Sequence, residues 1–131
     1  MSSVAGDEKT RLDILRVLYE RARGLSHEYM WHVSHGDLIQ TLHVPNDSLA
    51  FNIAYLKQKH LVNVRETTDT WTSAAITADG MDIVERVISL EEESKKEKPD
   101  KGKVRVTLDW LKANAGWIVP TLWDIIKNIK I

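Results

Sequence analysis

The chain has 131 residues, of which 43% are hydrophobic and 28% charged, and its formal net charge is −1. This length and composition indicate one ordinary globular domain, with room for an appendage. The absence of cysteine excludes disulfides, thiolate catalysis and cysteine-based metal sites, and the net charge lacks the strongly basic balance of a domain that neutralises many phosphates.

Two features of the sequence bear on where the protein resides. The start, MSSVAGDEKTR, has no apolar run of the kind that secretion signals contain, and no stretch of about 18 apolar residues occurs anywhere. We therefore expect a cytoplasmic protein without a membrane-spanning segment.

The first predicted element is an amphipathic helix over about residues 8–23. Asp7 and Glu8 place negative charge at its start, and Gly24 supplies its end. The segment LSHEYMWHVSHG that follows has no clear period and is expected to form a short strand or a buried loop, with Ser34 or His35 preceding a second helix, GDLIQTLHV. Pro45 ends that helix, because proline disfavours helical geometry in the residue before it.

A third helix is predicted over about residues 48–60. Leu49, Ile53 and Leu56 form its core stripe. The polar run Asn46 to Ser48 stands where a side-chain oxygen caps a helix start, so each of its three residues is a candidate cap.

The runs LVNVRE and WTSAAIT alternate with period two and are rich in β-branched residues, which predicts a β-hairpin. Thr77 or Asp79 is placed to cap a fourth helix, in which Gly80 falls near the first turn.

The segment 91–103, EEESKKEKPDKGK, is almost entirely charged and is expected to be a solvated helix extension followed by a linker. It separates a domain over residues 1–90 from a C-terminal amphipathic helical segment over residues 104–131. Residues 1–89 carry nine Lys/Arg and twelve Asp/Glu, whereas residues 90–131 carry nine and seven.

The C-terminal segment shows an unbroken 3-4 spacing of apolar residues, typical of a helix that packs against another helix. Gly116 and Pro120 predict a kink or a division within it. Three destinations remain open for this face: helices of the same chain, the same helix of a second copy in a homodimer, which we favour, or a different protein or a membrane surface. The residues of this interface are Leu108, Leu111, Ala115, Ile118, Leu122, Ile125 and Ile129.

The order of three helices, a hairpin and a further helix resembles that of winged helix-turn-helix DNA-binding domains, over about residues 8–89. DLIQTLHVPNDSLAFNIAYLKQKHLVNVRE is similar to the two helix-turn-helix elements and the first wing strand, and ITADGMDIVERVI is similar to the strand end, turn and helix that follow the wing. The resemblance implies a mainly α fold with a small β-hairpin, in the order α-α-α-β-β-α, followed here by the C-terminal amphipathic helix.

The resemblance also implies a DNA-contacting surface on the third helix and the wing. The recognition-helix residues would be Asn46, Ser48, Asn52 and Tyr55 at bases and Lys57 and Lys59 at phosphates, and the wing residues would be Arg65, Thr68 and Thr70. The sequence departs from the usual pattern, since this helix contains no arginine and Asp47 stands where phosphates would approach. The alternative is that these polar residues cap the helix or form an ordinary solvated face.

The five histidines show no spacing of a metal site, and no phosphate loop, nucleophile motif or convincing pair of carboxylates occurs. We therefore expect no metal, no cofactor and no enzymatic activity. The leading hypothesis is a winged helix transcription regulator that binds double-stranded DNA and dimerises through its C-terminal helix. The alternative is a protein-interaction adaptor that does not bind DNA and whose C-terminal helix recruits a partner.

Overall fold

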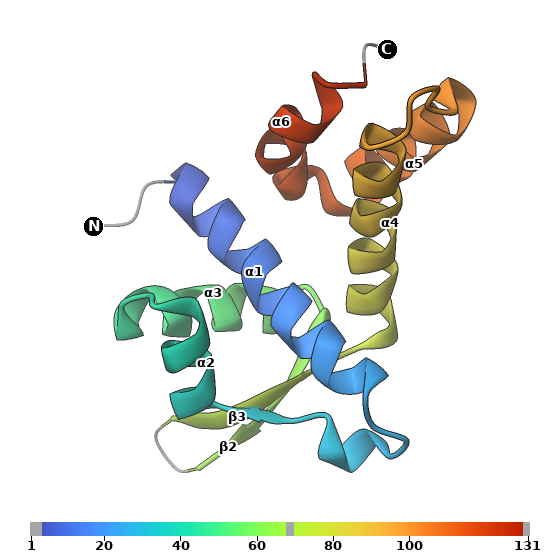
Figure 1. Cartoon of the computed structure of the whole chain (residues 1–131). Helices are drawn as coiled ribbons and strands as arrows, with labels where there is room; N and C mark the ends of the chain where they lie inside the picture. The colour runs from blue at the N-terminus through green and yellow to red at the C-terminus, as the bar shows by residue number, and fades with distance from the viewer. Residues whose placement is uncertain (1–3, 68–69, 130–131) are drawn as a thin grey trace. The chain divides into compact units, whose positions relative to one another are not determined.

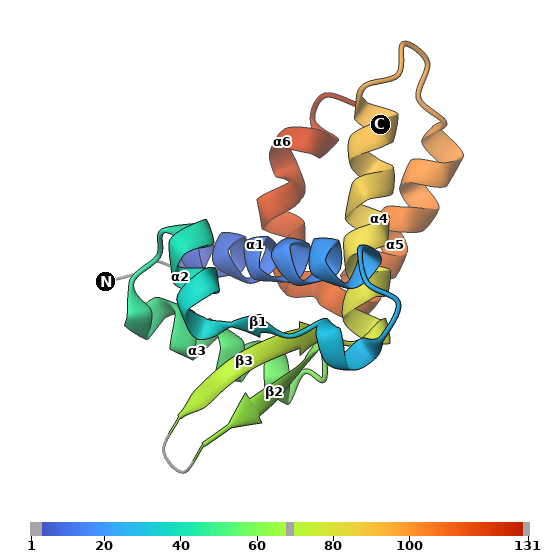
Figure 2. The same cartoon turned by 60° about the horizontal axis from the view of Figure 1, so that its bottom comes forward.

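The computed structural model describes residues 4–67 and 70–129, which form helices and one small sheet (Figures 1 and 2). The elements are α1 (Val4–Arg23), the 3-10 turn η1 (Glu28–Met30), β1 (Val33–Ser34), α2 (His35–Leu42), α3 (Asn46–Gln58), β2 (Val62–Glu66), β3 (Trp71–Ile76), α4 (Ala78–Ser94), α5 (Lys101–Ala115), η2 (Gly116–Leu122) and α6 (Trp123–Ile126). The expected mainly α fold with a small antiparallel hairpin is confirmed.

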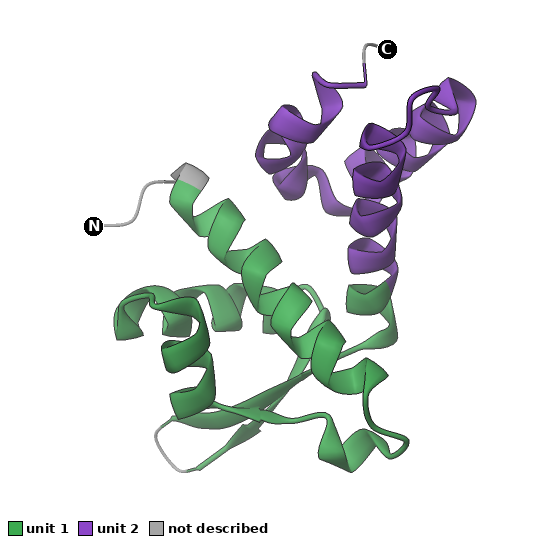
Figure 3. Cartoon of the chain, viewed as in Figure 1, with its two compact units in different colours: residues 1–81 green, residues 82–131 purple. Residues whose placement is uncertain are grey.

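The chain forms two compact units, residues 1–81 (unit 1) and residues 82–131 (unit 2) (Figure 3). The division falls within α4, earlier in the chain than the boundary expected at residue 90. Within the expected linker 91–103, α4 continues to Ser94 and α5 begins at Lys101, so only residues 95–100 lie outside the helices.

Unit 1 places α1, α2 and α3 around a three-stranded antiparallel sheet of order β1-β3-β2. The hairpin register pairs Val62 with Ile76 and Val64 with Ala74. β1 adds a third strand through Val33 and Ala74, which decides between the strand and the loop expected for residues 25–36. The core contains apolar side chains from each of these helices and from the sheet, among them Leu15, Leu18, Leu38, Leu49, Ile53, Leu56 and Ile76.

Helix starts follow the predicted caps at two of three places. The Ser34 hydroxyl accepts a hydrogen bond from the Asp37 amide at 3.1 Å, and the Thr77 hydroxyl accepts one from the Gly80 amide at 3.2 Å. The caps predicted for the third helix are wrong, because α3 begins earlier and Asn46 is already helical. Pro45, with its φ of −59° fixed by the ring, stands at the cap position, and its carbonyl accepts from the Leu49 amide.

Thr77 and Gly80 also join the end of β3 to the turn after α3. The Thr77 hydroxyl donates to the His60 carbonyl at 2.8 Å, and the Thr77 amide donates to the Leu61 carbonyl. A Cβ added to Gly80 would lie 2.5 Å from that same Leu61 oxygen. Glycine is therefore required here for close backbone approach.

The C-terminal segment is divided. α5 ends at Ala115, Pro120 lies inside the 3-10 stretch η2, and the short α6 follows. Six of the seven residues assigned to a dimer interface are buried within a single copy, and Ile125 is half-buried. The assignment to a dimer seam is therefore corrected to packing within one chain: Leu108, Leu111, Ala115, Ile118, Leu122 and Ile129 are buried, and Ile125 lies beside them in sequence.

In unit 2 the turn between α4 and α5 is held by one buried carboxylate. Glu93 accepts from Lys96 Nζ at 2.7 Å and from the Asp100 amide at 3.2 Å, and Lys103 Nζ lies 3.9 Å away. The Lys96 hydrogen bond is the main cause that lowers the pKa of Glu93. Farther along the two helices, the Arg86 guanidinium stacks 3.7 Å from the Trp110 ring centroid. None of the helices in the described part of the chain is long and apolar enough to cross a membrane.

Candidate functional site between helix α3 and the hairpin

The solvent-facing side of α3 carries few charges. Its exposed residues include Asp47, Ala50, Phe51, Ala54 and Lys57, and the Phe51 side chain is 57% exposed. Burying a phenylalanine stabilises a protein by roughly 1.5–3 kcal/mol. An exposed phenylalanine between two exposed alanines is therefore a surface on which another apolar group gains free energy by packing.

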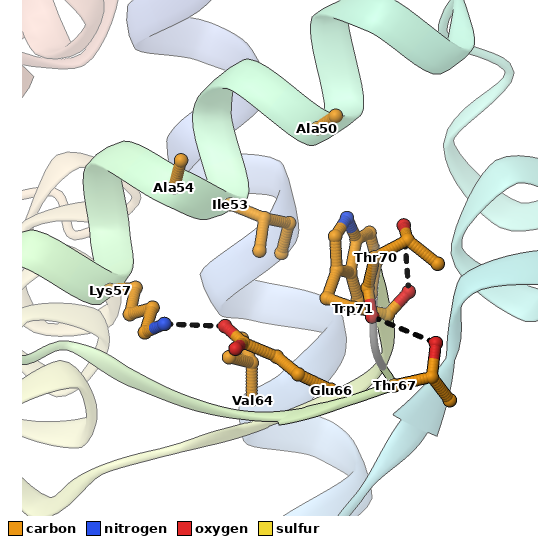
Figure 4. A pocket seen from close by; sticks show the side chains of 9 residues that line it. All are labelled: Ala50, Ile53, Ala54, Lys57, Val64, Glu66, Thr67, Thr70 and Trp71. Carbon is orange, nitrogen blue, oxygen red and sulfur yellow. Dashed lines mark hydrogen bonds and ion pairs between the residues drawn. The ribbon is translucent and has the colours of Figure 1, made fainter.

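A cavity of about 300 Å³ lies between α3 and the hairpin (Figure 4). Ile53 extends from α3 toward the strands, and the Trp71 ring rises from the start of β3 toward α3. The short side chains of Ala50 and Ala54 leave room above Ile53 and Trp71. The residues lining this cavity are Ala50, Ile53, Ala54, Lys57, Val64, Glu66, Thr67, Thr70 and Trp71.

A second cavity of about 380 Å³ adjoins the first, since both are lined by Ala50, Thr70 and Trp71. His35 and Asn46 also line it; His35 meets the Trp71 ring edge-on at 4.9 Å, and His35 Nε2 lies 2.5 Å from Asn46 Oδ1. We call the two adjoining cavities the α3–hairpin groove. Its lining combines the apolar side chains of Ile53, Val64 and Trp71 with polar side chains, among them Thr70, which lines both cavities.

The one lysine that lines the groove is already paired. Lys57 Nζ forms a hydrogen-bonded ion pair with Glu66 Oε1 of β2, shown in Figure 4. Both side chains are half exposed, so the pair contributes little to stability. It does neutralise the positive charge that was expected to meet a phosphate.

The structure corrects the role of Asn52, which is fully buried between α3 and α1. Its Oδ1 accepts from Arg11 Nε at 2.9 Å, and its Nδ2 donates to the Ser48 carbonyl at 2.8 Å and to Asp7 Oδ1 at 3.1 Å. All of its hydrogen-bonding groups face the protein interior. Asn52 therefore holds α1 against α3 and is not presented to a base edge.

Two more of the predicted base-contacting residues are turned away from the groove. Ser48 is only 8% exposed, and the half-buried Tyr55 ring lies 3.6 Å beneath the Arg11 guanidinium. Lys59 is exposed, with its Nζ 5.6 Å from the same ring. Of the four residues proposed for bases, Asn46 alone is an exposed residue at the groove.

The two described wing residues, Arg65 and Thr70, contact different parts of the chain. Thr70 lines the α3–hairpin groove, whereas the exposed Arg65 side chain donates to the Tyr29 carbonyl at 3.2 Å. Thr68 lies outside the described residues. The structure therefore does not bring Arg65 and Thr70 together as one phosphate-contacting edge.

A third cavity, of about 420 Å³, has among its lining residues Glu28, Tyr29, Trp31, His32 and Asn63. Burial and the nearby Arg65 charge lower the pKa of His32, whose Nδ1 lies 3.0 Å from the Ser73 hydroxyl. Among the described residues, no third group orients this imidazole as a nucleophile–base pair requires. We assign no chemistry to this cavity.

No cluster of three or more histidine, aspartate or glutamate side chains within residues 4–67 and 70–129 is placed to hold a metal ion. Comparison of the chain with protein-family models, curated proteins and solved structures gives no match. The site is therefore defined by its own geometry.

Sequence reasoning missed the apolar part of the site. The signal for Phe51 was present, because it lies outside the Leu49, Ile53 and Leu56 stripe on the same helix. Trp71 and His35 lie 36 residues apart in sequence and meet only because β1 brings the start of α2 beside β3.

Proposed function

We propose that unit 1 is a winged helix-turn-helix scaffold that serves as a non-enzymatic adaptor and binds a protein segment in the α3–hairpin groove. The order of α1, α2, α3 and the hairpin supports the scaffold. One observation carries the function: the groove is floored by Ile53, Val64 and Trp71, while Lys57, the lysine among its described lining residues, is paired with Glu66.

The chemistry of the groove indicates its occupant. A large apolar side chain of the partner fits above Ile53 and Trp71, where Ala50 and Ala54 leave space, and a second packs on Phe51. The charge left unpaired on this face of α3 in the described structure is that of Asp47, so a basic side chain beside the apolar ones complements it. The proposed partner is thus an apolar peptide segment with a basic flank.

Selection from a displayed library of random peptides tests this proposal on the full chain. We expect enrichment of peptides that combine aromatic or large aliphatic residues with lysine or arginine, and the affinity of a selected peptide should fall at least tenfold in Ala54→Glu. Ala113→Glu is the matched control, because Ala113 is an exposed helical alanine on α5 in unit 2. Equal enrichment on Ala54→Glu and on the unchanged chain would overturn the proposal.

Duplex DNA bound by α3 remains the second candidate function. Asn46 is exposed at the helix start, and Lys57 and Lys59 are exposed near its end, which is the placement that a recognition helix uses. Against it stand the buried Asn52, the Lys57–Glu66 pair and the position of Asp47. Asparagine with two lysines gives few contacts for specific recognition.

The two candidates differ in one measurable response. If α3 binds DNA, replacing Lys57 and Lys59 with alanine removes two phosphate contacts. The slope of log affinity against log salt should then fall by about two. The adaptor proposal predicts that this double variant and Asn46→Ala leave the affinity for a labelled random-sequence duplex unchanged. Fluorescence anisotropy across a salt series decides between them.

A further inference from the structure

Positive charge in unit 2 is concentrated in one stretch. Residues 95–112 contain seven Lys/Arg and three Asp/Glu, although the whole chain has a net charge of −1. The stretch covers the turn after α4 and most of α5. This local excess is a feature separate from the α3–hairpin groove.

The pairing within this stretch shows which cations are available. Lys96 and Lys103 are engaged by the buried Glu93 carboxylate, and the Asp100 side chain accepts from the Lys103 amide at the start of α5. The other five cations are exposed and make no ion pair with any residue of the described segments: Lys95, Lys98, Lys101, Arg105 and Lys112.

Three of these cations share one side of α5. Lys101, Arg105 and Lys112 are spaced i, i+4 and i+11, which places them within about 40° of one another around a helix axis and along roughly 16 Å of its length. We call these three residues the α5 strip. A line of cations roughly 16 Å long is long enough to meet more than one phosphate of a nucleic-acid strand.

We propose that the α5 strip, extended by Lys95 and Lys98 at the turn, binds the phosphate backbone of duplex nucleic acid without regard to base sequence. The three strip cations release counterions when they meet phosphates, which is the main source of sequence-independent affinity. The site does not depend on α3, and it does not require the protein partner proposed above.

Other anionic partners fit this surface less well. A helix that lies on an anionic membrane needs a broad apolar face, whereas Val104, Leu108 and Leu111 of α5 are buried and Val106 is its one exposed large apolar residue among those described. An acidic protein would bury apolar area beside the charges, and the strip offers none on its own side of the helix. A phosphate backbone, by contrast, is bound by exposed cations alone and needs no apolar area beside them.

The experiment uses the full chain and a labelled random-sequence DNA duplex, with anisotropy measured across a salt series. The test variant carries Lys101→Gln, Arg105→Gln and Lys112→Gln. The matched control carries Lys9→Gln, Arg21→Gln and Arg23→Gln, which removes three exposed charges from α1 instead. Circular dichroism of each variant establishes that it is folded. The single variant Lys98→Gln gives a second readout, because it should lower the salt slope less than the triple variant does.

We expect the slope of log affinity against log salt to fall by about 3 in the test variant and to remain unchanged in the control. Equal losses in both variants would show a net-charge effect and overturn the proposal. So would the absence of binding at low salt, or binding of phosphatidylserine vesicles or polyglutamate as tight as that of the duplex. A loss confined to Lys57→Ala with Lys59→Ala would instead place DNA at α3.

Discussion

Asn52 occupies the core side of α3, directly before Ile53 and between Leu49 and Leu56 in the helical repeat. The helical repeat places Asn52 toward the core, but a buried asparagine requires hydrogen-bond partners, and those come from α1. Arg11 lies 41 residues away and Asp7 lies 45 residues away. No local spacing reveals such partners, which is why resemblance to a recognition helix assigned Asn52 to bases.

Replacing Asn52 with alanine tests its structural role. The change leaves Arg11 Nε without its acceptor in a buried position, and we expect the free energy of unfolding to fall by about 2 kcal/mol. Urea denaturation measures this loss. Asn46→Ala, at an exposed position of the same helix, should change the value by less than about 0.5 kcal/mol; similar effects of both variants would contradict the assignment.

Gly80→Ala tests the close approach between the start of α4 and the turn after α3. The added methyl group meets the Leu61 carbonyl and the Ile76 side chain, so we expect destabilisation of about 1–3 kcal/mol. Gly36→Ala is the control, because no atom lies within 4 Å of its added Cβ and alanine favours a helix. A thermal unfolding midpoint that is unchanged in Gly80→Ala would rule out this packing requirement.

At the scale of elements, periodicity predicted α1, α2, α3, the hairpin and α4, because each has a continuous apolar stripe or alternation. Two features escaped it. β1 is two residues long and forms only by pairing with β3. The position of the break in the C-terminal helix depends on Gly116 and Pro120, which both lie in η2. Short elements stabilised by distant partners have no period of their own.

The turn between α4 and α5 predicts a pH dependence. The pKa of Glu93 is lowered in the folded chain, so its ionised form stabilises the fold at neutral pH, and this contribution is lost as the pH falls through the folded pKa, below the ordinary glutamate value. Glu93→Gln should lower the unfolding midpoint at pH 7 and reduce the difference between pH 7 and pH 3. Chemical denaturation at both pH values checks this; an unaltered pH dependence would contradict it.

At the scale of the whole molecule, the apolar stripe of the C-terminal segment is used within one chain. We therefore predict that sedimentation equilibrium gives the mass of one chain at micromolar concentration. Leu122→Ala should lower the free energy of unfolding by about 2–5 kcal/mol without a change in mass, because Leu122 is fully buried. A dimer that dissociates in Leu122→Ala would contradict this prediction and support the dimer interface expected from the sequence.

The sequence predicted the helices and the hairpin better than the groove between them. Caps, stripes and the hairpin pattern are local properties, whereas the α3–hairpin groove depends on which side chains of α2, α3 and β3 meet. The same holds for the charges. The acidic excess of residues 1–89 can be counted in the sequence, but the pairing of Lys57 with Glu66 and of Lys96 with Glu93 appears only in the folded chain.

The central claim is that the α3–hairpin groove binds an apolar peptide segment and that duplex DNA does not enter it. Nuclear magnetic resonance of the isotope-labelled full chain, titrated with a library-selected peptide and then with a random-sequence duplex, tests this most directly. The peptide should shift the amide resonances of Ala50 and Ala54 and the indole resonance of Trp71, while the duplex should leave these three signals in place. Duplex-induced shifts at those three groups, with none from the peptide, would contradict it.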